Sequence, residues 1–80
     1  MTEQVEVYDN GGESFDRYTV VFSERPEGRG MFYALGMSEN PTHPQGFGQH
    51  TTAQNGSHLG ERIELDDLPI DCRNLVMREF

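Results

Sequence analysis

Apolar and polar side chains alternate in three segments of the chain, as in strands that bury one face; these segments are residues 4–8, 14–23 and 61–65. Between the first two, residues 9–12 read Asp-Asn-Gly-Gly, which is typical of a tight turn because Asn and Gly accept positive φ angles. We therefore expect the first two segments to form a hairpin and the third to be the last strand of a sheet.

Residues 31–37 predict a further strand that is apolar on both faces. Its odd-numbered positions begin with Met, Tyr and Leu, and its even-numbered positions include Phe32 and Ala34. A strand without a polar face is typical of the centre of a sheet that is covered on both sides. The polar residues 23–30, which include a proline and two glycines, are expected to form the turn before this strand.

The end of the chain predicts one helix, from Pro69 to about Glu79. Proline is favoured at a first helical position, and Asp71 and Arg78 place a negative and a positive charge where the helix dipole favours each. Four apolar residues follow the helical period and form one stripe, which should pack on the sheet: Leu68, Cys72, Leu75 and Val76. The predicted fold class is α+β, a small antiparallel sheet of three to five strands with one C-terminal helix packed on a face, in a single domain of residues 1–80.

A stretch rich in proline and glycine, residues 36–50, separates the two halves of this pattern. Pro41 and Pro44 remove backbone donors, so the stretch is neither a long helix nor a central strand. We expect an ordered loop in which Phe47 packs on the sheet. The Gly-Phe-Gly sequence within it lacks the lysine and the spacing of a phosphate-binding loop. For residues 51–58, a short strand with a turn and a continuation of the loop are both compatible with the composition.

Charge changes this picture, because it is large and unevenly distributed. Fourteen acidic residues stand against six arginines and no lysine, which gives a formal net charge of −8. The acidic residues gather in residues 1–16 and 61–71, whereas residues 40–60 contain no Asp, Glu, Lys or Arg. Direct binding of nucleic acid is disfavoured, because phosphate binding depends on Lys and Arg. The charge predicts a basic protein surface as the partner.

Size, hydropathy and cysteine content exclude further classes of protein. A chain of 80 residues with 34% hydrophobic residues and a mean hydropathy of −0.72 builds one small core. No apolar run approaches the roughly 20 residues that cross a bilayer, so we expect no membrane association. The single cysteine precludes an intramolecular disulfide, and no signal-peptide pattern begins the sequence, so we expect a cytoplasmic protein.

Two kinds of reactive site compete with a binding function. A zinc site would use His43, His50, His58 and Cys72, but the gaps of seven, eight and fourteen residues between them are wider than in structural zinc sites. Cys72 would be a nucleophile near a helix N-terminus, but its place in the apolar stripe favours a packing role. We therefore expect no enzymatic activity, no metal and no cofactor.

The acidic residues themselves have two interpretations. A net charge away from zero keeps small domains soluble, and this alone explains an acidic surface. Alternatively, carboxylates at i and i+2 on a strand, such as Glu64 and Asp66, stand about 6.6 Å apart. That spacing is close to twice the roughly 3.4 Å between phosphates along one DNA strand. A strand edge of this kind would imitate phosphates on a surface that binds DNA.

The pattern Gly-Met-Ser-x-Asn-Pro-x-His-Pro-Gln-Gly-Phe-x-Gln, at residues 36–49, resembles a family of small proteins from bacteria and their phages. Residues 58–63 and 67–69 belong to the same resemblance, which covers about residues 17–80. The resemblance implies no established activity. Some short, acidic phage proteins of similar size and charge are anti-CRISPR proteins, which inhibit type I surveillance complexes in the cytoplasm of the bacterial host.

We therefore expect a non-catalytic inhibitor that blocks DNA binding by a type I CRISPR complex through an acidic surface. The alternatives are a bacterial housekeeping or regulatory interaction protein and a metal-binding protein that uses histidine and cysteine. The residues expected to contact the partner are Glu3, Glu6, Asp9, Glu64, Asp66 and Asp67, with Phe47 and His50 adding short-range contacts.

Overall fold

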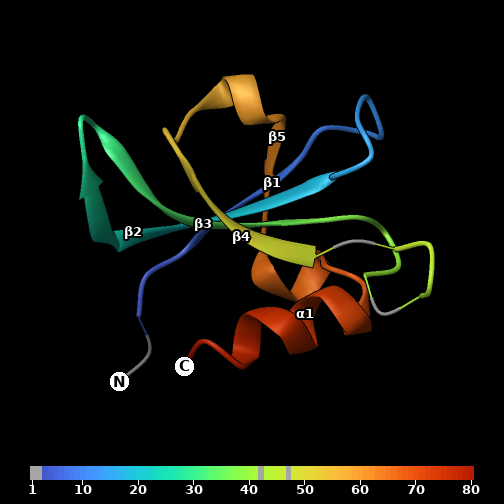
Figure 1. Ribbon diagram of the computed structural model, residues 1–80. Helices are drawn as coiled ribbons and strands as arrows, with labels where there is room; N and C mark the ends of the chain where they lie inside the picture. The colour runs from blue at the N-terminus through green and yellow to red at the C-terminus, as the bar shows by residue number, and fades with distance from the viewer. Residues whose placement is uncertain (1–2, 42, 47) are drawn as a thin grey trace.

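The computed structural model describes residues 3–41, 43–46 and 48–80, which form one sheet and one helix (Figure 1). The sheet is antiparallel throughout, and its strand order is β4-β3-β2-β1-β5. The α+β fold class is confirmed. The elements are β1 (Glu6–Asp9), β2 (Tyr18–Gly28), β3 (Met31–Met37), β4 (Gly48–Ala53), β5 (Glu61–Ile63) and α1 (Ile70–Met77), with single 3-10 turns η1 (Ser57–Leu59) and η2 (Leu65–Asp67).

Helix α1 covers one face of the sheet, as the apolar stripe predicted (Figure 1). Cys72 and Val76 on the helix are fully buried, and Leu68 before it is nearly so. They pack against alternate residues of the central strands, including Val20 and Phe22 of β2. This packing of the period-3.6 stripe on the period-2 face forms the main core.

The opposite face of the sheet carries a second, smaller apolar cluster. It contains Tyr8 of β1, Val21 of β2 and Ala34 of β3, with Leu59 of η1 packed against them. The prediction that β3 is a central strand covered on both sides is therefore confirmed. In the described part of the chain, no helix is long and apolar enough to cross a membrane.

The expected polar turn at residues 23–30 is wrong, because most of it is strand. Strand β2 continues to Gly28, and the turn is confined to Arg29 and Gly30, which both have positive φ (58° and 76°). The register between β2 and β3 shifts on either side of Pro26. These shifts accommodate Pro26, which has no N–H to donate to the neighbouring strand. They also interrupt the alternation of apolar and polar side chains, so the sequence pattern does not reveal this part of the strand.

Other boundaries also differ from the sequence prediction, since β2 begins at Tyr18 instead of residue 14 and the last strand and the helix are shorter than expected. The last strand ends at Ile63 instead of residue 65, because Glu64 caps η2: the Glu64 side chain and the Asp67 side chain each accept a bond from the other's backbone N–H. The helix ends at Met77, and Pro69 is its N-cap residue instead of its first helical residue. The last two differences arise from capping at the ends of elements.

The proline-rich stretch is shorter than expected, because the flanking strands extend into it. Residues 36–37 end β3, which is a central strand, and residues 48–50 begin β4. The N–H of His43 donates to the Asn40 carbonyl at 3.1 Å, and the N–H of Gly46 donates to the His43 carbonyl at 2.7 Å. A Cβ on Gly46 would lie 1.7 Å from the Asn40 carbonyl oxygen, so this turn requires glycine. Phe47, the expected anchor, lies outside the described residues.

Candidate acidic interface

The fold brings the two acidic parts of the sequence to the same edge of the sheet. Strand β5 pairs with β1, and Asp9 faces Glu61 in the register. Strands β3 and β4, toward the other edge, contain no Asp, Glu, Lys or Arg. Charge is therefore polarised across the strand order, from an acidic β1–β5 side to an uncharged β4 side.

The three N-terminal carboxylates expected to contact a partner are used in internal contacts instead. Glu3 accepts two bonds from Arg25, each 2.7 Å long. Asp9 accepts a bond of 2.7 Å from Arg17. The side chains of Glu3 and Asp9 are 19% and 20% exposed, so little of either carboxylate faces solvent.

Glu6 is held in the same way on the face of the sheet opposite α1. The Tyr8 hydroxyl donates a bond of 2.7 Å to Glu6, and Asn55 donates to both of its oxygens. The bond from Tyr8 lowers the pKa of Glu6 despite partial burial, with smaller contributions from Asn55 and Arg62. These contacts hold Glu6 as a charged structural group.

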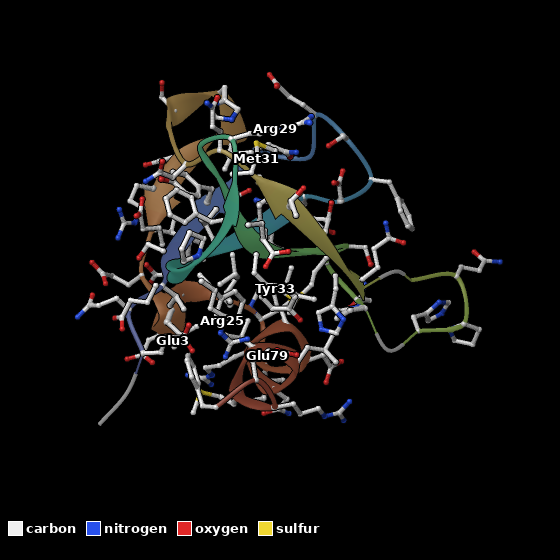
Figure 2. The ribbon with its side chains drawn as sticks, turned by 60° about the vertical axis from the view of Figure 1, so that its left-hand side comes forward. Glu3, Arg25, Arg29, Met31, Tyr33 and Glu79 are labelled. Carbon is white, nitrogen blue, oxygen red and sulfur yellow. The ribbon has the colours of Figure 1, made fainter. Side chains whose placement is uncertain are left out.

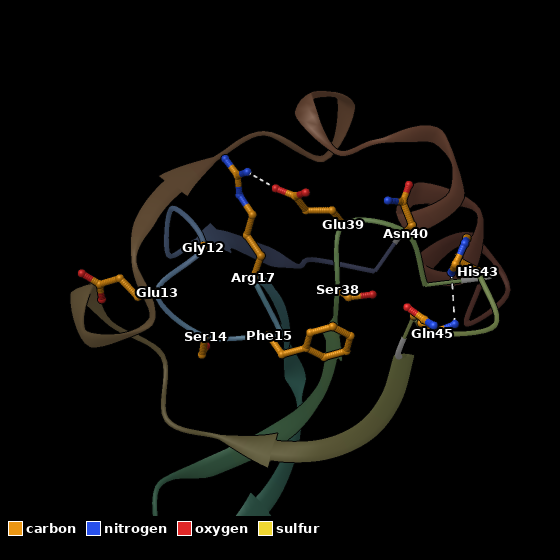
Figure 3. A pocket seen from close by; sticks show the side chains of 11 residues that line it. Gly12, Glu13, Ser14, Phe15, Arg17, Ser38, Glu39, Asn40, His43 and Gln45 are labelled. Atoms are coloured by element: carbon orange, nitrogen blue, oxygen red, sulfur yellow. Dashed lines mark hydrogen bonds and ion pairs between the residues drawn. The ribbon is translucent and has the colours of Figure 1, made fainter.

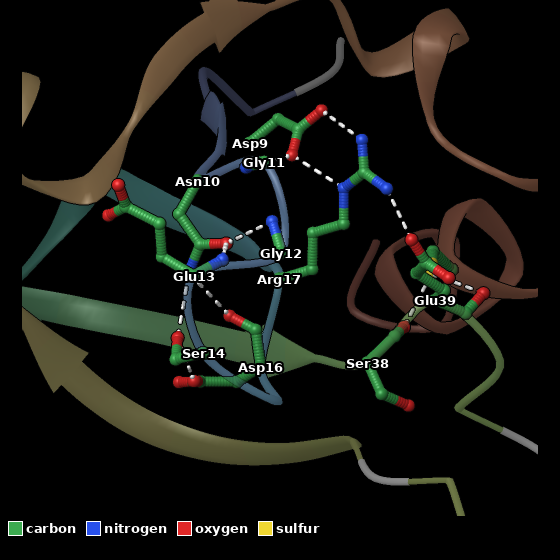
Figure 4. A network of polar contacts seen from close by, with 11 residues as sticks. Asp9, Asn10, Gly11, Gly12, Glu13, Ser14, Asp16, Arg17, Ser38 and Glu39 are labelled. Carbon is green, nitrogen blue, oxygen red and sulfur yellow. Dashed lines mark hydrogen bonds and ion pairs between the residues drawn. The ribbon is translucent and has the colours of Figure 1, made fainter.

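Figure 4 shows the corresponding network around Arg17, at the turn between β1 and β2. Arg17 bridges Asp9 and Glu39, and so ties this turn to the end of β3. Its bond lowers the pKa of Asp9 below the usual range. Asn10 accepts from the backbone N–H groups of Gly12 and Glu13, which closes the turn. This network orders the β1–β2 turn.

The C-terminal carboxylates are exposed, but they are not spaced along a strand. Glu64 is the N-cap of η2 and Asp66 lies within this turn, so the expected strand spacing between them does not exist. Asp66 is 91% exposed and its nearest cation, Arg73, is 3.6 Å away. Exposed ion pairs of this kind contribute little to stability.

Together these placements define an acidic edge on β5 and the turn that follows it. Its members share exposure to solvent and proximity to the free edge of the sheet, and they are Glu61, Glu64, Asp66 and Asp67. Glu61 was missed from the sequence, because the alternation places it on the same face as the apolar residues Ile63 and Leu65. Strand β5 is only three residues long and carries Arg62 as its one cation.

His50 lies far from this acidic edge, on β4. It is separated from β5 by four strand spacings, about 19 Å. Its side chain is 58% exposed, its Nε2 lies 2.8 Å from Glu79, and its ring stacks on Tyr33 with 5.3 Å between centroids. His50 and the acidic edge are therefore not parts of one continuous patch.

A second network, which the sequence did not reveal, is centred on Arg25 of β2 (Figure 2). Arg25 pairs with Glu3 and with Glu79, and its guanidinium lies 4.7 Å from the centre of the Phe22 ring. Tyr33 donates to the same Glu79 carboxylate at 3.1 Å. Because residues 23–30 were expected to be a turn, nothing pointed to an inward Arg25. The network joins both ends of the described chain to the sheet.

A pocket of about 610 Å³ lies between the β1–β2 turn and residues 38–46 (Figure 3). Its lining includes Phe15, which is 64% exposed, with Asn40, His43 and Gln45. The backbone N–H of Gln45 donates to Nδ1 of His43 at 3.1 Å. The cation in the lining, Arg17, is neutralised by its two carboxylates. The pocket therefore offers amide and imidazole groups to a ligand, but no free cation for an anion.

The structure supports neither a metal site nor a nucleophilic cysteine among the described residues. In residues 3–41, 43–46 and 48–80, no group of three His, Cys, Asp or Glu side chains is arranged to hold a metal ion. Cys72 is fully buried, and its thiol donates to the Ser38 carbonyl at 3.2 Å. Burial raises the pKa of this thiol to about 11, with smaller contributions from Asp71 and Glu39. A buried, protonated thiol is poorly suited to nucleophilic attack.

Comparisons with protein-family models, with curated proteins and with solved structures give no match to this chain.

Proposed function

We propose that the protein is a non-catalytic binding protein whose acidic edge contacts a surface rich in arginine and lysine. The observation that carries this proposal is the pairing of β1 with β5, which places the exposed carboxylates of the acidic edge beside an already acidic strand. Two arginines lie at this edge, Arg62 on β5 and Arg73 at 3.6 Å from Asp66, against four carboxylates, so the edge keeps a net negative charge.

The proposed partner is a DNA-binding surface, and the narrower proposal is a type I CRISPR surveillance complex. The small size, the charge of −8 and the resemblance to proteins of bacteria and phages support this choice. The acidic edge would occupy the basic surface and exclude DNA by competition. Competition of this kind needs no regular phosphate-like spacing, because several carboxylates attract a basic surface from any close arrangement.

The proposal is tested with a variant that removes charge from the acidic edge but keeps its hydrogen-bond acceptors: Glu61→Gln, Glu64→Gln, Asp66→Asn and Asp67→Asn. Amide oxygens still accept the capping bonds of η2, so the thermal melt should change little. The control removes charge at exposed residues elsewhere, with Glu13→Gln, Glu24→Gln and Glu27→Gln. The measurement is DNA binding by a purified type I complex with each protein added, at several salt concentrations.

We expect the wild type and the control to inhibit DNA binding, and the acidic-edge variant to inhibit at least about tenfold more weakly. Inhibition should weaken as salt rises. Full inhibition by the folded acidic-edge variant would remove this edge from the mechanism. If the wild type inhibits no type I complex, a pull-down from bacterial lysate with both variants identifies the basic partner of a regulatory interaction protein instead.

A further inference from the structure

Among the residues that the structure describes, strand β4 forms a free edge of the sheet that lacks the usual protection. Five of its six residues are exposed, and its register with β3 runs from Gly48 to Ala53 without a shift. It contains no charged residue and no proline. Edge strands of monomeric proteins are normally short, bulged, charged or covered, because their unpaired N–H and C=O groups bind other strands.

The other free edge of the same sheet shows that protection. Strand β5 has only three residues, two of which are Glu61 and Arg62, and the chain turns away from the edge at Glu64. The β5 edge is therefore protected against pairing with another strand, whereas the β4 edge leaves its backbone N–H and C=O groups available for it.

We propose that β4 is a dimerisation edge, on which a second copy of the chain adds its own β4 in antiparallel orientation about a two-fold axis. The two sheets would join into one of ten strands. In an antiparallel edge strand, alternate residues direct their N–H and C=O groups outward, so about half of the residues in Gly48–Ala53 would pair with the second copy. A two-fold axis makes the same strand its own partner.

The charge distribution favours a second copy over a basic partner at this edge. Residues 40–60 carry no Asp, Glu, Lys or Arg, so β4 offers nothing that selects a basic segment. Two copies joined through β4 keep their acidic edges at the two far ends of the combined sheet. Each chain carries a net charge of −8, and this arrangement places the strongest repulsion at the greatest distance.

The predicted dimer is weak and has a characteristic salt dependence. Pairing of six residues buries less than the roughly 800 Å² per partner of a stable complex, so it should dissociate on dilution. Salt screens the repulsion between two acidic chains, so the dimer should strengthen as salt rises. Binding to a basic partner through the acidic edge should instead weaken as salt rises. The failure of the dimer proposal can therefore be distinguished from the failure of the proposed function.

The first test is sedimentation equilibrium of the wild type from micromolar to millimolar concentration, at low and high salt. The expected mass rises with concentration from 9.1 kDa toward twice this value, and more readily at high salt. Hydrogen exchange over the same range should slow by at least tenfold at the outward amides of β4. A chain that stays monomeric throughout would overturn the proposal.

The second test places like charges on both faces of β4, with Thr51→Lys and Thr52→Lys. Both side chains are exposed, so the fold should persist, while the charge at Thr52 of one copy would lie diagonally next to the charge at Thr51 of the other and should weaken the dimer at least about tenfold. The control adds the same charge at exposed residues elsewhere, with Gln4→Lys and Asn74→Lys, and should dimerise like the wild type. If the β4 variant still forms the dimer, and dimerisation does not slow the hydrogen exchange of the β4 amides, the interface lies elsewhere.

Discussion

The hydroxyl of Tyr33 donates a hydrogen bond of 3.1 Å to the carboxylate of Glu79, 46 residues further along the chain. Arg25 donates to the same oxygen of Glu79, at 3.2 Å, and Nε2 of His50 lies 2.8 Å from the other. One carboxylate thereby connects β2, β3 and β4 to the segment that follows α1. This set of bonds holds the end of the helix against the sheet.

Replacing Arg25 should destabilise the protein although Arg25 lies near the surface. Arg25→Met keeps an apolar stem over Phe22 but leaves the carboxylates of Glu3 and Glu79, each with a 19% exposed side chain, without their cation. We expect a loss of about 1 to 3 kcal/mol in the free energy of unfolding.

The measurement is urea denaturation of the wild type and both variants. Arg29→Met is the matched control, because Arg29 is exposed in the β2–β3 turn and keeps the same backbone geometry. An equal effect of the two substitutions would show that the Arg25 network does not stabilise the fold.

Acid should weaken the fold through Glu79. Burial raises the pKa of Glu79, but the hydrogen bonds from His50, Tyr33 and Arg25 together lower it below its usual value. A carboxylate with a lowered pKa in the folded state contributes stability above the pKa of the unfolded chain, about 4.5. That contribution is lost as the pH falls through the lower pKa of the folded state.

Glu79→Gln tests this contribution, because the amide keeps the size but not the charge. The variant should be less stable than the wild type at pH 7, and the difference should shrink between about pH 5 and pH 3. Urea denaturation at a series of pH values measures it. A difference that stays constant over this range would mean that the charge of Glu79 does not contribute.

Docking of the helix is tested by Leu75→Ala. Leu75 packs against the main core and is partly buried, so its truncation should cost about 2 kcal/mol, at the lower end for such substitutions. Ile70→Ala is the control on the same helix, because the Ile70 side chain is 58% exposed and should change stability by less than about 0.5 kcal/mol. An unchanged thermal melt for Leu75→Ala would contradict the packing of α1 on the sheet.

The turn at residues 40–46 should reject any side chain at Gly46. A Cβ there would overlap the Asn40 carbonyl, which is backbone and cannot move without opening the turn, so Gly46→Ala should cost about 2 kcal/mol or more. At Gly48 the added Cβ would meet Leu75 Cδ1 at 2.8 Å, and this end of a flexible side chain can rotate away. Gly48→Ala should therefore cost less than about 1 kcal/mol in the same thermal melt.

Hydrogen exchange of the wild type checks a related prediction, that this turn is ordered. The amides of His43 and Gly46, which donate to backbone carbonyls, should exchange slowly, and Gly46→Ala should accelerate both. Fast exchange of these amides in the wild type would contradict an ordered turn.

The sequence predicted the elements whose apolar residues form a clear strand or helix pattern. Strand β3 was located at the observed residues, and the faces of β2 and α1 follow the predicted alternation and stripe. Residues 48–50 of β4 were assigned to the loop and residues 51–53 were left open, because Gln49 to Thr52 are polar on both sides of the strand and so show no alternation. The outer half of β2 was missed because a proline, a glycine and a shifted register resemble a turn.

For the candidate interface, the sequence predicted an acidic surface but not which carboxylates form it. Alternation indicates which side chains share a face, but not which strands are neighbours, so the pairing of β1 with β5 was hidden. The internal partner of Glu3, Arg25, was hidden because it lies in a segment expected to be a turn. Glu6 and Asp9 are bonded to residues of the predicted hairpin itself, Tyr8 and Arg17, but alternation does not show which side chains form hydrogen bonds. The internal hydrogen bonds therefore decide which carboxylates are available to a partner.

The buried thiol of Cys72 gives the molecule an internal reporter of helix detachment. The thiol is enclosed between α1 and the end of β3, where it bonds to the Ser38 carbonyl. A thiol reagent such as dithionitrobenzoate reaches it only while α1 is displaced, so the labelling rate measures how often the helix opens. Because the chain has one cysteine, each labelling event reports on this site alone, and no engineered probe is needed.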